Sequence, residues 1–172
     1  MVDDQGSNKK GSNENGLHKK CNTTSQHSHS DLPILCDMLS MCFDGFFANS
    51  SLCGRVSNTL DRHVFKKVSS LYRRLAERLL YGVGRLPEDT GTMNPEPGYI
   101  ATAYLSALNA SEKYLSNRVM SVNGQVVKRI GRLVQQLKNR LFANMIVDYL
   151  ACIQMVLDNV KHQRMSAKLT KG

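Results

Sequence analysis

Residues 126–165 read VVKRIGRLVQQLKNRLFANMIVDYLACIQMVLDNVKHQRM. This stretch contains no proline, and its apolar side chains recur at steps of three or four positions, which is the spacing of one face of an α-helix. A helix with one apolar side has to bury that side against other helices. The stretch therefore predicts one long C-terminal helix in an all-α protein. The stripe consists of Ile130, Val134, Leu137, Leu141, Met145, Tyr149, Ile153, Val156 and Val160.

The spacing of this stripe favours a helical bundle over a two-stranded coiled coil. Its average step is about 3.75 residues, more than the ~3.6 of a straight helix, so the apolar stripe drifts around the helix instead of keeping a heptad seam. A helix of roughly forty residues would be about 60 Å long, and we expect part of it to protrude from a small bundle.

The composition agrees with a helical bundle. With 172 residues, the chain is long enough for one domain and a tail. The absence of tryptophan and an aromatic content of 6% indicate a core of leucine, valine, isoleucine and methionine.

The first part of the chain divides into a tail and a first helix. Residues 1–30 are polar, with almost nothing to bury, and predict a disordered tail before a helical domain at 31–172. From Leu32 to Phe47 the apolar residues fall on one face, which predicts a short amphipathic helix for docking or for the core. Glycine, asparagine and serine between Gly45 and Gly54 predict a loop.

Two further helices are expected before the long one. Ser57 or Asn58 can cap a helix that runs to about Tyr81, and residues 85–98, rich in proline and acidic residues, predict a linker. A third helix should begin near Tyr99 and end before Asn123-Gly124. That dipeptide is a strong turn signal, which we interpret as the link between two antiparallel helices, with a β-hairpin as the alternative.

The formal net charge of the chain is +9, and the excess lies in the expected helices. Residues 1–31 carry four basic and four acidic side chains, whereas residues 99–172 carry eleven basic and three acidic ones, a net of +8. This charge suits nucleic acid, acidic lipid or an acidic protein partner. Basic residues at helical spacing form the candidate nucleic-acid-binding set, namely Arg62, Lys66, Arg73, Lys128, Arg129, Arg132, Lys138 and Arg140.

The cysteines and the apolar runs bear on location. Five cysteines without tight spacing, and no apolar signal peptide, predict reduced thiols in the cytoplasm or nucleus. The N-x-S/T triplets at Asn22, Asn49 and Asn109 are then chance matches. No run of eighteen apolar residues occurs, and we expect no transmembrane span.

Motifs for catalysis or metal binding are weak. His18, Cys21, His27 and His29 could supply zinc ligands, but their spacing matches no zinc finger, and a solvated polar tail explains them better. The carboxylates are scattered, and we expect caps or ion-pair partners, no enzyme and no cofactor. Asp148, inside the densest apolar segment, either faces solvent or specifies a partner.

We therefore expect a non-enzymatic subunit or adaptor that assembles through protein partners or self-association along its C-terminal helix. The alternative is a DNA- or RNA-binding protein that uses the basic helix faces. A third hypothesis is a regulator that inserts the helix at 32–47 into a target. The candidate partner-binding residues are Leu35, Leu39, Phe43, Phe46, Leu137, Leu141, Met145, Tyr149, Ile153 and Val156.

Overall fold

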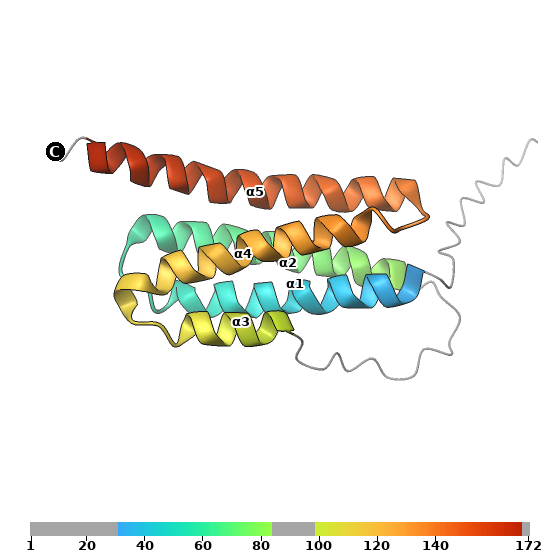
Figure 1. Cartoon of the computed structure of the whole chain (residues 1–172), viewed down its shortest axis with the longest axis horizontal. Helices are drawn as coiled ribbons and strands as arrows, with labels where there is room; N and C mark the ends of the chain where they lie inside the picture. Colours follow the sequence, from blue (N-terminus) through green and yellow to red (C-terminus); the bar gives the residue numbers. More distant parts are fainter. Residues whose placement is uncertain (1–30, 84–98, 170–172) are drawn as a thin grey trace, which may run out of the picture.

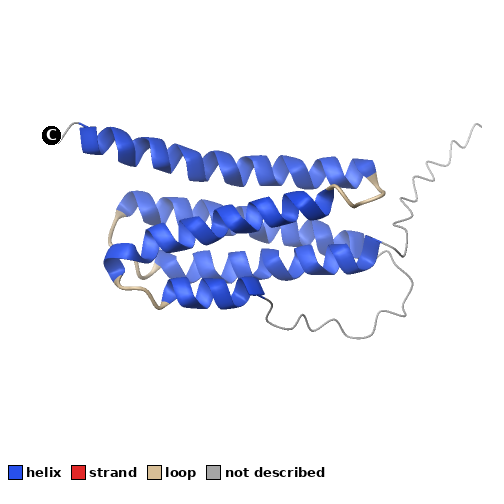
Figure 2. Ribbon diagram, in the orientation of Figure 1, coloured by secondary structure: helices blue, strands red, loops and turns tan. Residues whose placement is uncertain are grey.

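The computed structural model describes residues 31–83 and 99–169, which form five helices and no strand (Figures 1 and 2). The prediction of an all-α bundle with a long C-terminal helix is confirmed. The expected tail at 1–30, the linker at 85–98 and the four candidate zinc ligands lie outside the described residues. The helices are α1 (Leu32–Cys53), α2 (Thr59–Val83), α3 (Tyr99–Leu108), α4 (Glu112–Val134) and α5 (Arg140–Leu169).

Successive helices run antiparallel along one long axis (Figure 1). The pairing of α1 with α2 is the most extensive, and α4 packs against α1, α3 and α5. Helix α5 lies on α2 and α4 at one side of the bundle, whereas α3 lies on α1 and α4 at the opposite side. The two outermost helices are therefore α5 and α3.

Helix α1 is longer than the sequence predicts, because it continues through the expected loop at 45–54. A Cβ on Gly45 would lie 2.7 Å from the ring of Tyr72, so this glycine lets α1 approach α2 closely. Asn49 donates to the carbonyl of Gly45 over 2.7 Å, and the hydroxyls of Ser50 and Ser69 lie 2.7 Å apart. The glycine, asparagine and serine residues that predicted a loop therefore make contacts within α1 and between α1 and α2.

Helix α2 begins as predicted. The side-chain oxygen of Asn58 accepts hydrogen bonds from the backbone N–H groups of Leu60 and Asp61 at 2.9 and 3.2 Å, which is the geometry of an N-cap. The helix continues two residues past the expected end at Tyr81.

Both interpretations of Asn123-Gly124 are wrong, because α4 passes straight through this dipeptide. The third expected helix instead breaks at residues 109–111, after which α4 starts at Glu112. Asn123 is fully buried, and its side chain forms two reciprocal 2.9 Å amide hydrogen bonds with Asn49 of α1. Its Oδ1 also accepts a 2.6 Å hydrogen bond from the Tyr104 hydroxyl of α3. These contacts with other helices replace the turn that the local sequence favours.

The long helix expected over residues 126–165 is interrupted at residues 135–139, between α4 and α5. The carboxylate of Asp31, at the start of α1, accepts hydrogen bonds from the backbone N–H groups of Lys138 and Asn139, the shortest at 3.1 Å. The side-chain oxygen of Asn139 accepts a 3.1 Å hydrogen bond from the N–H of Phe142 and caps the new helix. Leu137 fills the core inside the turn, with 2% exposure.

The break rotates the apolar stripe. Leu141, expected on the buried side, is 82% exposed, whereas Ile146 and Leu150 are buried in its place. Met145 and Tyr149 are half-buried at the edge of the core. Before and beyond this region the stripe is as predicted, with Ile130, Val134, Leu137, Ile153, Val156 and Val160 buried.

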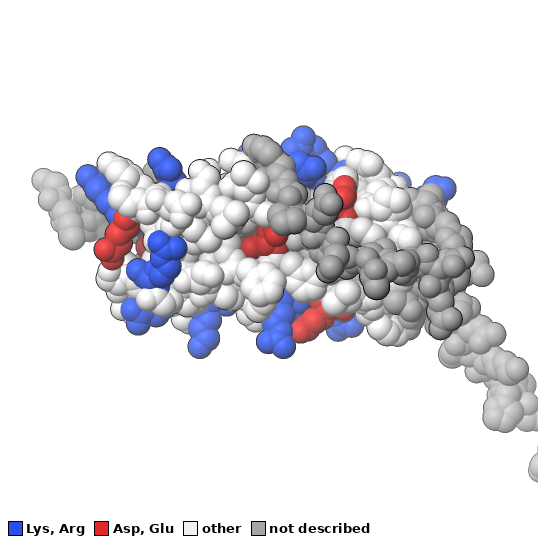
Figure 3. All heavy atoms as spheres, turned by 90° about the horizontal axis from the view of Figure 1, so that it is seen from below, with Lys and Arg blue, Asp and Glu red and all other residues white. Residues whose placement is uncertain are grey.

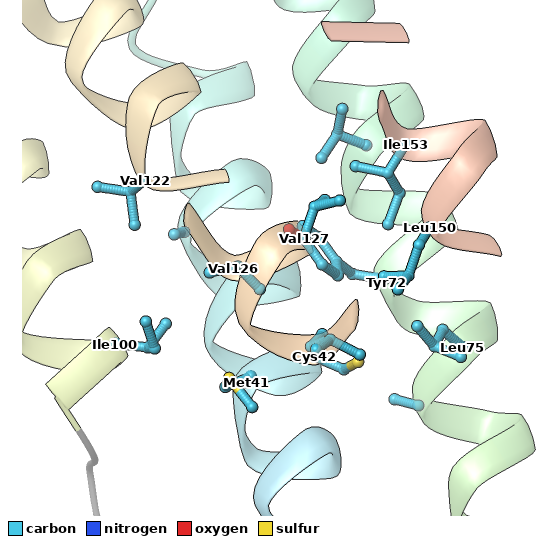
Figure 4. Packing of buried hydrophobic residues seen from close by; sticks show 14 of the residues in the cluster. Met41, Cys42, Tyr72, Leu75, Ile100, Val122, Val126, Val127, Leu150 and Ile153 are labelled. Atoms are coloured by element: carbon cyan, nitrogen blue, oxygen red, sulfur yellow. The ribbon is translucent and has the colours of Figure 1, made fainter. Parts of the chain in front are cut away.

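The core draws apolar side chains from all five helices, as Figure 4 shows for a part of it around Tyr72. Among the described residues, α1 and α5 are long and apolar enough to cross a membrane. This is weak evidence for a span, since the core helices of soluble proteins also meet these criteria, and 44% and 33% of the two apolar segments are buried in the bundle.

Candidate interaction surfaces

Most residues of the predicted partner-binding set lie inside the chain's own bundle. The buried members are Leu35, Leu39, Leu137, Ile153 and Val156, and the half-buried ones are Phe43, Phe46, Met145 and Tyr149. Only Leu141 is largely exposed. Side chains that hold the bundle together are not free to contact a partner, so a partner would have to contact the apolar residues that the fold leaves exposed.

The outward face of α5 is one such surface. Met155 is 60% exposed and Val147 48%, and Ala151 and Cys152 are also exposed beside them. From Leu141 to Leu157 the helix carries a single charged residue, Asp148. We call this surface the outer face of α5, defined by Leu141, Val147, Asp148, Ala151, Cys152 and Met155.

The charge on the outer face of α5 lies at its centre. Leu141, Asp148 and Met155 are spaced seven residues apart, which is two helical turns, so they lie in one line along the helix. Asp148 is exposed, which agrees with the first of its two sequence interpretations, a residue that faces solvent. A carboxylate in the middle of an otherwise uncharged surface would favour a partner that presents a positive charge at that point.

A second apolar surface is a groove between α1 and α3, with a volume of about 680 Å³. Phe47 and Leu105, on opposite walls, are 62% and 61% exposed. The sequence placed Phe43 and Phe46 among the partner-binding residues but missed the groove, because its second wall is a different helix. The lining residues are Ser40, Phe43, Asp44, Phe47, Ala48, Ser51, Ala101, Tyr104, Leu105 and Leu108.

Among the described residues, Asp44 is the one charged residue that lines the groove of α1 and α3. Its Oδ2 is buried and has no hydrogen-bond partner, which among the described residues holds for no other buried side-chain oxygen or nitrogen. Burial raises the pKa of the Asp44 carboxyl above its ordinary value of 3.8, because the charged form loses hydration.

The eight basic residues of the nucleic-acid alternative are all exposed, on α2, on α4, in the turn before α5 and at the first residue of α5. Arg73 forms an ion pair with Glu77, with N and O 3.0 Å apart. No ion pair within residues 31–83 and 99–169 involves Lys128, Arg129 or Arg132 of α4. No ion pair in this part of the chain therefore neutralises these three charges of α4, which could pair with an anionic partner.

A polar cleft of about 420 Å³ lies where α2, α4 and α5 meet. Arg164 of α5 forms a 2.6 Å ion pair with Asp61 of α2 and also donates to Asn117 of α4. The expectation that Asp61 is a cap or an ion-pair partner is thus confirmed, and Arg164 fastens the C-terminal half of α5 to the bundle.

Burial affects a thiol and two tyrosine hydroxyls among the described residues. Cys42 is a fully buried core residue, and burial raises the pKa of its thiol. Burial likewise raises the pKa of the Tyr72 and Tyr104 hydroxyls. In the part of the chain that the structure describes, no three histidine, cysteine or acidic side chains are placed to hold a metal ion.

Comparison with known proteins gave no match to this chain among protein families, curated proteins or solved structures.

Proposed function

We propose that this protein is a non-enzymatic helical subunit that assembles with another protein through the outer face of α5. The observation that supports the proposal is the exposure of a long, almost uncharged face of α5, whereas the neighbouring helices α2 and α4 expose many lysine and arginine side chains. A helix that is apolar on both its sides is normally covered on both. The bundle covers the inner side of α5, and a partner would cover the outer one.

The side chains on the outer face of α5 indicate which kind of partner would bind it. Leu141 and Met155 are the anchors, because each exposes most of its side chain and each would contribute about 1.5–3 kcal/mol on full burial. Asp148 lies between them and needs a counter-charge once water is excluded. The expected occupant is a helix that presents apolar side chains on either side of a lysine or arginine.

The test replaces both anchors, Leu141→Asp and Met155→Asp, in the tagged full-length chain. Both side chains point outward, so the variant should keep the circular dichroism spectrum of the wild type. The measurement is quantitative mass spectrometry of proteins retained from native extract after nuclease treatment, followed by the affinity of the purified partner for both chains. We expect the variant to lose that partner by tenfold or more in affinity.

The matched control is Leu80→Asp, which alters an exposed leucine of α2 outside the outer face of α5. The control should bind the partner as the wild type does. Equal binding by the anchor variant would refute the proposal. So would a chain that only dimerises with itself, measured as a doubled mass in light scattering, or one that only floats with lipid vesicles.

The second candidate function is the binding of a polyanion such as DNA or RNA by the basic side of α4. The observation in its favour is the absence of any ion pair at Lys128, Arg129 and Arg132 in the described part of the chain. Replacing Arg129, Arg132 and Arg140 with glutamate should abolish binding to duplex DNA or RNA that weakens as salt is raised. Unchanged binding by this variant, or no salt-sensitive binding by the wild type, would exclude this function.

A further inference from the structure

The groove between α1 and α3 lies on the other side of the bundle from α5. It has two features that are typical of a binding site: exposed apolar walls and an acidic side chain without a hydrogen-bond donor among the described residues. Its walls expose Phe47 and Leu105, one from each helix. Seen from the side of α3, much of the surface is uncharged, and basic residues stand toward its margins (Figure 3). Exposed aromatic and aliphatic side chains that face one another across a groove are typical of helix-binding sites.

The second feature is the carboxylate of Asp44. A buried acceptor without a donor is rare in folded proteins and costs free energy, and the cost is greater when the group is charged. Asp44 is only half-buried and lines the groove, so a donor that entered the groove could reach its carboxylate. The Tyr104 hydroxyl, which also lines the groove, already donates to Asn123 and is not available to it.

The charge that lines the groove is opposite in sign to the net charge of the chain. The chain carries a formal net charge of +9, yet the single charged side chain that the described residues place in the groove is acidic. A cation is therefore attracted to this groove and repelled from most of the other exposed surface. A volume of about 680 Å³ holds several side chains at once, so a lone cation would not fill it.

We propose that the groove of α1 and α3 is a second docking site, which binds an amphipathic helix of a partner protein whose apolar face carries one lysine or arginine that pairs with Asp44. Phe47 and Leu105 hold the apolar side chains, and the cation donates to the carboxylate. This site does not depend on the function proposed for α5, because no residue is shared between the two surfaces.

The probe is an alanine-based helical peptide of about 16 residues, with leucines spaced three and four positions apart and one lysine between them on the same face. A matched peptide has glutamine in place of the lysine. Fluorescence anisotropy of labelled peptide with the full chain gives the two affinities. We expect the lysine peptide to bind about ten- to a hundredfold more tightly, which is the range for a shielded charge-assisted hydrogen bond.

Two variants locate the binding. Asp44→Asn keeps the shape of the side chain and should make the two peptides bind equally, by weakening only the lysine peptide. Leu105→Asp should weaken both peptides, since it places a charge on the apolar wall. The variant with Leu141→Asp and Met155→Asp should bind both as the wild type does, which separates this site from the outer face of α5.

Four results would overturn the proposal. The first is no binding of either peptide to the wild-type chain, and the second is equal binding of both. The third is a preference for lysine that survives in the Asp44→Asn variant, which would place the cation elsewhere. Tight binding of an organic amine such as phenylpropylamine, with no binding of the peptides, would also overturn it and assign the groove to small cations.

Discussion

Replacing Asn123 with alanine should destabilise the bundle far more than its place in a turn-forming Asn-Gly dipeptide suggests. The side chain is fully buried and joins three helices through hydrogen bonds to Asn49 and Tyr104. Alanine is a good helix former, and in an exposed helix this substitution would stabilise α4 slightly. The expected loss of stability therefore comes from the contacts between helices.

The size of the effect follows from the groups left without partners. Asn49 Nδ2 would keep its 2.7 Å bond to the carbonyl of Gly45, but Asn49 Oδ1 would lose its only donor among the bonds described above. The Tyr104 hydroxyl would lose the acceptor 2.6 Å away. Each buried, unsatisfied group costs about 1–3 kcal/mol, so the two together predict a loss of roughly 2–6 kcal/mol. This is a large part of the about 5–15 kcal/mol that stabilises an ordinary domain.

The assay is urea unfolding followed by far-ultraviolet circular dichroism, with Asn144→Ala as the control on the exposed surface of α5. The control should change the free energy of unfolding by less than about 0.5 kcal/mol. A double-mutant cycle with Asn49→Ala should show that the double variant loses less than the sum of the two single variants, because neither amide then remains unpaired. A loss for Asn123→Ala no larger than that of the control, or strict additivity in the cycle, would refute the reasoning.

Four other substitutions have expected outcomes. Gly124→Ala should stabilise the protein by about 0.5–1 kcal/mol, since the glycine lies inside α4 with open space around it. Gly45→Ala should destabilise the protein by about 1–3 kcal/mol, because the added methyl group would clash with the buried Tyr72 ring. Thermal unfolding measures both changes. Asp44→Asn should stabilise the chain at neutral pH and have little effect below pH 3.8. Burial raises the pKa of the Asp44 carboxyl in the folded chain, so the wild type loses stability as the pH rises above 3.8 and the carboxyl ionises. Asparagine does not ionise, so the variant should not lose this stability. Asp31→Ala should leave the N–H groups between α4 and α5 without their acceptor, which faster amide hydrogen exchange at Lys138 would reveal.

The parts of the fold that the sequence predicted are those with local causes. Helix α2 has its cap at Asn58, within three residues of the groups it binds, and its apolar face repeats along the same helix. The bundle class followed from the same kind of periodicity. Such signals are complete within a short stretch, so no knowledge of the other helices was needed.

The errors occurred where a distant residue changes the role of a local signal. Asn123 reads as a turn until Asn49, 74 positions away, is known to pair with it. Gly45 reads as a loop residue until the Tyr72 ring is placed against it. The turn between α4 and α5 contains neither glycine nor proline and is held by Asp31, 107 positions before Lys138.

The candidate surfaces were predictable only in part. The outer face of α5 lies within the apolar stretch at residues 126–165, but the stripe that the sequence predicts includes residues that the bundle buries, such as Ile153. The groove was not predictable, because Phe47 and Leu105 become neighbours only when α3 packs on α1. The unpartnered oxygen of Asp44 is likewise a property of packing and not of residue type.

The carboxylate of Asp31, the first described residue, holds the turn in front of α5, and this has a consequence for the order of folding. Helices α1 and α2 are neighbours in sequence and can pair early, whereas α5 packs on α2 and α4 and follows a turn bonded to Asp31, so we expect α5 to dock last. If α5 is also the helix that meets a partner, its two faces stabilise each other, because a partner that binds only docked α5 draws the last folding step to completion. Substitutions at Asp31 would then weaken assembly without altering any residue of the interface.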